Sequence, residues 1–209
     1  MSWLDTLEEI RKRDWTEAPA KEREAKSREV VNICAYAASV TAVVPVPLAD
    51  LALLLPVHSV MVMTVGHIYG RKINQAEAKR IALELGAVAG LSFAGLAAIG
   101  ALKRLLLPAV GGLLSIPATF ALSWGLGRAS MTYFERPELS RDELKKVFEE
   151  AIKEGKSVFS PEAFERFRQK NPEVKVAPEP TQSTPPPAAE PSEPRAPADE
   201  SLRPKKRTL

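Results

Sequence analysis

Residues 30–70 read VVNICAYAASVTAVVPVPLADLALLLPVHSVMVMTVGHIYG and contain no lysine or arginine. Pro45 and Pro47 divide this stretch, because each proline removes a backbone donor and disfavours helix in the residue before it. The pattern therefore predicts two apolar helices, about 30–44 and about 48–69, joined by a tight turn. A helical hairpin is the first unit that we expect, and it indicates an all-α fold class.

The second of these helices carries two positions that need an explanation. Asp50 falls near its start, where a carboxylate satisfies free backbone amides and the helix dipole, so we interpret it as a capping residue. A buried Asp50 would be the alternative, and it would be the one acid of interest for chemistry. Pro56 lies further along the helix and is expected to kink it.

Two more apolar runs follow a polar connector. They cover 81–102 and 105–127, with Lys103 and Arg104 between them. A helix of about 20 residues covers about 30 Å, close to the thickness of the hydrocarbon core of a bilayer. Each run is long enough to cross a membrane, so the sequence predicts about four apolar helices arranged as hairpins.

The two runs differ in their small and helix-breaking residues. Glycine and alanine are frequent in 81–102, and small side chains let helix backbones approach closely. The run 105–127 is expected to be broken or kinked near its beginning. The residues responsible are Pro108, Gly111, Gly112 and Pro117.

Charge is distributed unevenly along the chain. Residues 1–29 carry seven basic and eight acidic side chains, residues 30–127 only six and three, and residues 128–170 ten and nine. Ten of the 18 prolines fall after residue 170, where large apolar side chains are scarce, a composition typical of disorder. We therefore expect a charged amphipathic helical arm (1–29), an apolar helical-hairpin domain (30–135), a small charged two-helix module (136–170) and a disordered proline-rich tail (171–209).

The arm has its own helix signals. Ser2 and Asp5 have the spacing of a helix cap, and Pro19 is expected to break the arm before a second helix leads into the apolar middle. Trp3 and Trp15 are open to two interpretations. They are anchors at a membrane–water interface, which indole rings favour, or they pack on the helical domain.

The charged module also has clear start signals. The motif SRDE at 140–143 is a capping box, and it predicts a helix that Gly155 ends. The motif SPE at 160–162 predicts the start of a second, short helix. Two such helices are too small to fold alone, so we expect them to dock on the rest of the chain.

Two physical interpretations compete for the charge-poor middle. Its helices insert into a membrane, or they pack on one another as the core of a soluble domain, since fully buried helices are also apolar on every side. Charge placement favours insertion, with both termini in the cytoplasm. Basic residues precede the first apolar helix, fill the connector 71–80 and follow the last run at Arg128, whereas the proline turn has none. Lys103 and Arg104 depart from this rule, and a cytoplasmic protein is the alternative.

No catalytic constellation is visible in the sequence. It lacks the GxxxxGK[ST] nucleotide loop and the GxSxG nucleophile elbow. Cys34, the single cysteine, falls in an apolar run, and His58 and His67 face opposite ways on one predicted helix. We therefore expect no enzyme activity, no cofactor and no metal site. The net charge of +3, mixed in sign, argues against nucleic acid as a partner.

One combination of motifs carries a family resemblance. A Pro-x-Pro-x-x-Asp turn is followed by a helix rich in Leu and Met that ends in Tyr-Gly, and then by a hairpin of small residues. Over about 30–135 this combination resembles the bacterial GTPase-associated, YcjF-like domain family, whose function is unknown. The resemblance supplies no catalytic residue, and His58 stands where related proteins often carry glutamine. The family-motif positions are Pro45, Pro47, Asp50, Pro56, Tyr69, Gly70, Pro108, Gly111 and Gly112.

The resemblance implies an inner-membrane protein that works beside a GTPase. Because this chain carries no GTPase motif, a GTPase would act in trans. We expect a non-catalytic membrane-associated anchor or adaptor, and the alternative is a soluble all-α interaction module or a hairpin protein that inserts conditionally. Membrane lipid is the first expected partner and a cytoplasmic GTPase the second. The sequence leaves open whether the chain forms a homo-oligomer.

Overall fold

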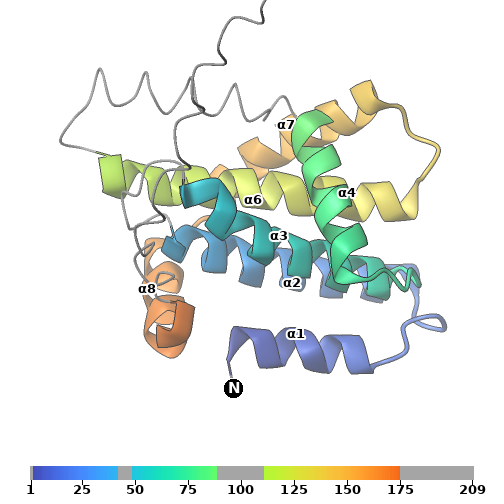
Figure 1. Ribbon diagram of the computed structural model, residues 1–209, viewed down its shortest axis with the longest axis horizontal. Helices are drawn as coiled ribbons and strands as arrows, with labels where there is room; N and C mark the ends of the chain where they lie inside the picture. Colours follow the sequence, from blue (N-terminus) through green and yellow to red (C-terminus); the bar gives the residue numbers. More distant parts are fainter. Residues whose placement is uncertain (1, 42–48, 89–110, 175–209) are drawn as a thin grey trace, which may run out of the picture. The chain divides into compact units, whose positions relative to one another are not determined.

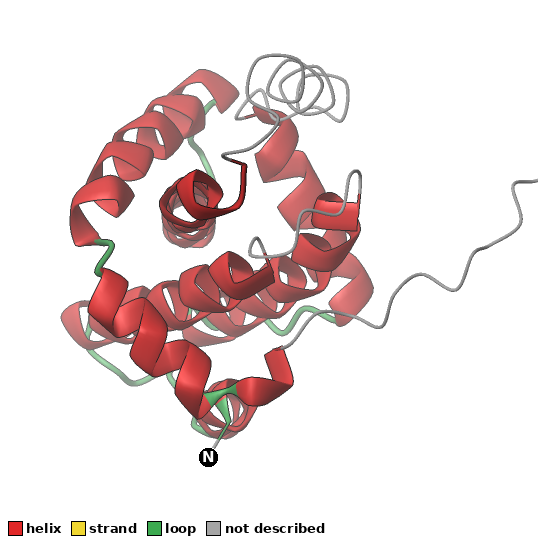
Figure 2. Cartoon of the chain, turned by 90° about the vertical axis from the view of Figure 1, so that its left-hand side faces the viewer, coloured by secondary structure: helices red, strands yellow, loops and turns green. Residues whose placement is uncertain are grey.

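The computed structural model describes residues 2–41, 49–88 and 111–174. Within these ranges every regular element is helical, as Figure 2 shows, and this confirms the predicted all-α class. In chain order the elements are α1 (Trp3–Lys12), α2 (Ala20–Thr41), α3 (Ala49–Ile68), α4 (Gln75–Val88), α6 (Gly111–Glu135), α7 (Arg141–Val158), α8 (Pro161–Lys170) and a short 3-10 helix, η1 (Pro172–Val174).

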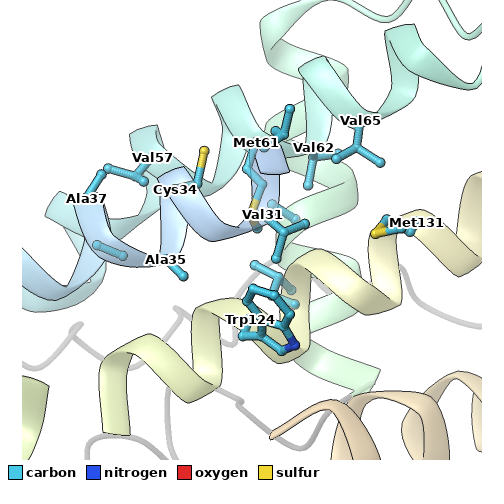
Figure 3. Packing of buried hydrophobic residues seen from close by; sticks show 14 of the residues in the cluster. Val31, Cys34, Ala35, Ala37, Val57, Met61, Val62, Val65, Trp124 and Met131 are labelled. Carbon is cyan, nitrogen blue, oxygen red and sulfur yellow. The ribbon is translucent and has the colours of Figure 1, made fainter. Parts of the chain in front are cut away.

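Three apolar helices form the core. Helices α2, α3 and α6 lie side by side in Figure 1, and each contacts the other two. Their facing side chains are buried together, as Figure 3 shows for Val31 of α2, Met61 of α3 and Trp124 of α6. Removing this apolar surface from water stabilises the fold by about 25 cal/mol for each Å². In the described helices, the charge-poor sequence thus becomes protein interior.

Helices α2 and α6 lie especially close because Gly127 has no side chain. A Cβ atom at Gly127 would lie 2.5 Å from both Cγ atoms of Val31, closer than two carbon atoms can pack. Ala35, Ala37 and Ala38 of α2 are also fully buried, and such small side chains let neighbouring helices pack closely. Small residues therefore set the separation of the two central helices.

Helix α1 begins as predicted. Asp5 N–H donates to Ser2 Oγ (3.2 Å), and Ser2 N–H donates to the Asp5 carboxylate (2.7 Å). These two reciprocal bonds form a capping box, which satisfies backbone donors that the first helical turn leaves free. The cap that the sequence predicted is therefore confirmed.

The end of α1 differs from the prediction. The helix stops at Lys12, well before Pro19. Asp14 Oδ1 accepts bonds from the Thr16 N–H (2.9 Å) and hydroxyl (2.7 Å), and such a local turn competes with helix. Pro19 instead stands directly before α2.

Both tryptophans of the arm pack inside the protein. Trp3 is 9% exposed and Trp15 is 2% exposed. The Trp15 indole N–H donates to the Ile10 carbonyl (2.8 Å), and the backbone N–H of Trp3 donates to Asn171 Oδ1 (2.9 Å). Of the two interpretations that the sequence left open, packing on the helical domain is the one found.

The two C-terminal helices dock on the core, as their size led us to expect. The ring of Tyr36 on α2 lies 4.6 Å from that of Phe120 on α6 and 5.9 Å from that of Phe167 on α8, measured between centroids. Ser160 N–H, at the start of α8, donates to the Tyr36 hydroxyl (3.3 Å). An aromatic cluster thus holds α8 against the central helices.

The predicted end of α7 is wrong, although both predicted caps of this module are present. Helix α7 runs through Gly155 to Val158. A Cβ atom at Gly155 would lie 2.9 Å from Ala121 Cα and 2.9 Å from Trp124 Cβ, both on α6. This glycine allows a close contact between helices and does not end one.

Ion pairs join α7 to two other helices. Glu154 of α7 lies 2.8 Å from Arg28 of α2 and 3.5 Å from Arg128 of α6. Glu24 of α2 lies 3.3 Å from Arg28 and 3.9 Å from Arg128. These side chains are partly exposed, so each pair contributes about 1 kcal/mol at most. The network therefore adds little to the stability of the fold.

The described helices do not support the predicted transmembrane hairpins. Within the described ranges, no helix combines the length and the apolar character that crossing a bilayer requires. Both described flanks of the predicted hairpin 81–127 pack against protein: Ile81 and Leu85 are each 2% exposed, and Phe120 is fully buried. Residues 89–110 lie outside the described ranges.

The predicted disordered tail begins too early. Asn171 is 6% exposed, and its side-chain amide donates to the Phe167 carbonyl (2.9 Å). The next three residues form η1. Residues 175–209, to which the rest of this prediction applies, lie outside the described ranges.

Candidate functional site

The family-motif pair Tyr69-Gly70 ends α3 in a defined turn. Gly70 has a φ of 76°, in the left-handed region that glycine adopts without strain. Gly70 N–H donates to the His67 carbonyl (3.0 Å), and Arg71 N–H donates to the Gly66 carbonyl (2.8 Å), the bond pattern of a Schellman motif. The turn leads directly into the short connector to α4.

Asn74 fixes the other end of this connector by capping α4. Its Oδ1 accepts the Glu77 N–H at 2.9 Å. Held by one motif at each end, the connector places Arg71 and Lys72 beside α1, where they line a pocket.

This pocket, which we call the basic pocket, has a volume of about 340 Å³ and lies between α1, the end of α3 and the connector. Small-molecule sites typically have volumes of about 300–1,000 Å³. Met63 and Ile73 supply its apolar surface, and Arg11 Nη1 lies 3.7 Å from Met63 Sδ. The full lining is Arg11, Met63, His67, Arg71, Lys72, Ile73 and Asn74.

Positive charge dominates the basic pocket. Arg11, Arg71 and Lys72 supply three basic side chains, and no carboxylate is among the described lining residues. The acid Asp14 lies near enough to feel Lys72 and His67. Hydrogen bonds from Thr16, and then these two side chains, hold the pKa of Asp14 below its usual range. The pocket is therefore suited to an anion.

His67 ties together the two walls of the basic pocket. Its Nε2 lies 3.0 Å from the Arg13 carbonyl oxygen, which can only accept, so we assign the ring proton to Nε2. The Arg13 side chain is engaged elsewhere, because its guanidinium pairs with Glu22 (2.7 Å) and lies over the Trp15 ring (4.1 Å). The end of α1 is thus bound to the last turn of α3, and this contact keeps Arg11 beside the connector.

The other histidine, His58, is a packing group. Its Nε2 lies 2.9 Å from Ser123 Oγ, which joins α3 to α6, and burial lowers the pKa of His58 to about 4. A serine beside a histidine invites comparison with a nucleophile and its base. However, Ser123 is 1% exposed, and an imidazole of such low pKa is a weak base at neutral pH. We therefore assign the pair to helix packing.

The remaining predicted positions do not join the basic pocket. Cys34 is fully buried in the core, as its apolar surroundings in the sequence predicted. Asp50 lies in the first turn of α3, Pro56 lies exposed inside that helix, and Gly111–Gly112 begin α6. The Asp50 side chain, and with it the predicted cap, lies outside the described part of the chain. The same is true of Pro45, Pro47 and Pro108.

The sequence did not reveal the basic pocket because its parts are far apart in the chain. Arg71 and Lys72 stood out only as charges beside a predicted membrane helix, and Arg11 did not stand out from its charged neighbours. The basic last turn of α1 was a visible signal. Nothing in the sequence, however, places that turn beside the connector.

Three comparisons relate the chain to known proteins. It is similar to the magnetosome membrane protein 22 of Magnetospirillum gryphiswaldense, with 26% identity over 145 residues that cover 65% of this chain and 73% of that protein. No solved structure matches the chain. These similarities support neither the YcjF-like assignment nor the association with a GTPase. A family model described as a domain of unknown function (DUF697) matches residues 9–157, well over half of the sequence, and the chain therefore belongs to this family.

Proposed function

We propose that the chain is a non-catalytic, membrane-associated protein that binds an anionic lipid surface. The basic pocket carries this proposal. Cations from two distant parts of the chain, Arg11 on the one side and Arg71 and Lys72 on the other, line one opening, and none of its described lining residues is a carboxylate. Anionic lipids attract such groups, by about 1 kcal/mol for each Lys or Arg near the surface.

The composition of residues 89–110 supports the same proposal. This stretch has Lys103 and Arg104 as its only charged side chains. We retain the sequence-based expectation that its apolar side chains contact lipid, which stabilises them by removing them from water. Electrostatic attraction and apolar contact together would give a firmer association than either alone.

The relative and the charges support a location at a membrane. The similar protein is bacterial, and its name describes it as a membrane protein. Basic residues concentrate on the cytoplasmic side of membrane proteins. With this support, we propose a location at the bacterial inner membrane, with the basic pocket and both termini in the cytoplasm.

Vesicle flotation tests the lipid part of the proposal. We expect the full chain to float with vesicles of phosphatidylcholine and phosphatidylglycerol and less with phosphatidylcholine alone. Added salt should weaken binding, because it screens exposed charges beyond about 10 Å at 0.1 M. A chain that stays unbound with every vesicle would contradict the proposal and favour a soluble all-α interaction module.

An adaptor role is the second part of the proposal. The charged helices α7 and α8 would then recruit a cytoplasmic partner, and a GTPase acting in trans is the class that the sequence resemblance suggests. Capture of the full chain from detergent extracts, with GTP and with GDP, should enrich a GTPase. Repeated captures without one would remove this part and leave the lipid part standing.

A further inference from the structure

We infer that the basic pocket binds a phosphomonoester, that is, a terminal phosphate group on a short organic part. Two sources share this chemistry, namely the headgroup of phosphatidic acid and a soluble compound such as glycerol 3-phosphate. The inference rests on the proposed membrane function only if the source is the lipid.

The kinds of donor in the basic pocket match a phosphate group. Arg11 and Arg71 each present planar, forked N–H groups that bind two oxygens at once, and Lys72 adds a compact positive charge. A phosphomonoester carries about −1.5 to −2 charges at neutral pH and has three strong acceptor oxygens. Three cations can therefore balance its charge without help from solvent ions.

The cations of the basic pocket form no close ion pair within the described protein, although Asp14 lies near Lys72, whereas other basic side chains nearby in the sequence are paired. Lys12 pairs with Glu9 (2.6 Å), Arg13 with Glu22 (2.7 Å) and Arg80, on α4, with Glu84 (3.9 Å). Among the described residues, no ion pair within 4.0 Å involves the three pocket cations. Their charge is therefore available to a ligand.

The apolar side chains of the lining would contact the organic part of the ligand. Arg11 Nη1 rests 3.7 Å from Met63 Sδ, which holds the guanidinium at the edge of the apolar surface. The Ile73 side chain packs against α3 at Gly66. A Cβ atom added to Gly66 would lie 3.2 Å from Ile73 Cδ1. A volume of about 340 Å³ holds a phosphate together with several carbon atoms, since one water occupies about 30 Å³.

A pair of double variants tests the inference. R71A/K72A removes two pocket cations. K79A/R80A removes two exposed cations of α4 that do not line the basic pocket, so the loss of charge is the same. Arg11→Gln changes the opposite wall and provides the test if R71A/K72A fails to fold, as judged by circular dichroism. The probes are glycerol 3-phosphate in calorimetry, and phosphatidylcholine vesicles that contain either phosphatidic acid or phosphatidylglycerol.

We expect the wild type and K79A/R80A to bind at least one phosphomonoester probe. R71A/K72A should bind it about tenfold more weakly or worse, as expected for the loss of charge-assisted bonds. On vesicles, a preference for phosphatidic acid over phosphatidylglycerol should disappear in R71A/K72A only. Binding of glycerol 3-phosphate alone identifies a soluble ligand, and binding of the phosphatidic acid vesicles alone identifies the lipid headgroup.

Other outcomes separate this inference from the proposed function. Equal losses of probe binding in both double variants would show that the probe is attracted by the overall positive charge, and would overturn the phosphate site. Membrane binding with no phosphomonoester preference in the wild type would also overturn it, while leaving membrane association intact. Binding of glycerol 3-phosphate by a chain that ignores every vesicle would support the site and contradict the membrane function.

Discussion

The imidazole of His58 packs between α3 and α6, where burial lowers its pKa from 6.5 to about 4. As the pH falls through 6.5, the unfolded chain takes up a proton at His58 and the folded chain does not. Acidification from pH 6.5 to 4 therefore destabilises the fold through this half-buried group, by at most about 3 kcal/mol at about 1.4 kcal/mol for each pKa unit. Urea unfolding at several pH values should show stability rising with pH across this window.

The substitution His58→Gln isolates this effect. A glutamine amide has a similar size, can keep a hydrogen bond to Ser123 and does not titrate, whereas the carboxylates of the chain remain unchanged. The variant should lose most of the pH dependence between 4 and 6.5. Equal pH slopes for wild type and variant would show that His58 is not buried as a neutral imidazole.

Cys34 should be unreactive in the folded chain. It is fully buried, and burial raises the pKa of its thiol, so little thiolate is exposed to a reagent. We expect alkylation by iodoacetamide to require unfolding, and therefore to be slow in the native protein and fast in denaturant. Rapid labelling under native conditions would contradict the packing of α2 in the core.

Residues whose role is local were the most predictable. The capping serines Ser2 and Ser140 bond to groups three residues away, so their spacing alone revealed them. Arg11 could not be identified in this way, because its role depends on contact with a connector that is distant in the chain. The basic pocket therefore could not be predicted, because its residues come together only in the folded chain.

The close contact of α2 and α6 gives a prediction about glycines in helices. Gly127→Ala should destabilise the fold by about 1–3 kcal/mol, since its Cβ would lie 2.5 Å from Val31 Cγ1. Gly86→Ala in α4 is the matched control: an added Cβ meets none of the described residues within 4 Å, so it should stabilise by about 0.4–1 kcal/mol. Urea unfolding followed by tryptophan fluorescence measures both. Equal effects at the two positions would refute the close contact.

Helix positions were predicted better than helix ends. The apolar pattern of 48–69 closely matches α3 (Ala49–Ile68), because apolar side chains must recur on every face of a buried helix. Gly155 was misread as an end because glycine both terminates helices and allows them to touch. Only the neighbouring α6 distinguishes the two uses. At Gly155, the end of the helix thus needed tertiary information, whereas the capping boxes at the helix starts did not.

The apolar side chains of a charge-poor sequence can be buried either in lipid or in a protein interior, and the sequence did not distinguish the two. The all-α class followed from periodicity and proline placement alone. The choice between lipid and protein interior did not, because buried helices and membrane helices have the same apolar composition. In the described ranges these side chains are buried within the protein itself, as the core residues of α2, α3 and α6 show. The proposed membrane association therefore rests on the basic pocket and on the composition of residues 89–110.

Fractionation of bacteria that express the full chain tests membrane association most directly. Membranes are pelleted and then washed with high salt. The chain should sediment with the membranes and remain in the pellet after the salt wash, because apolar contact persists when charges are screened. Complete recovery in the first supernatant, followed by purification without detergent as a monodisperse species, would contradict the account.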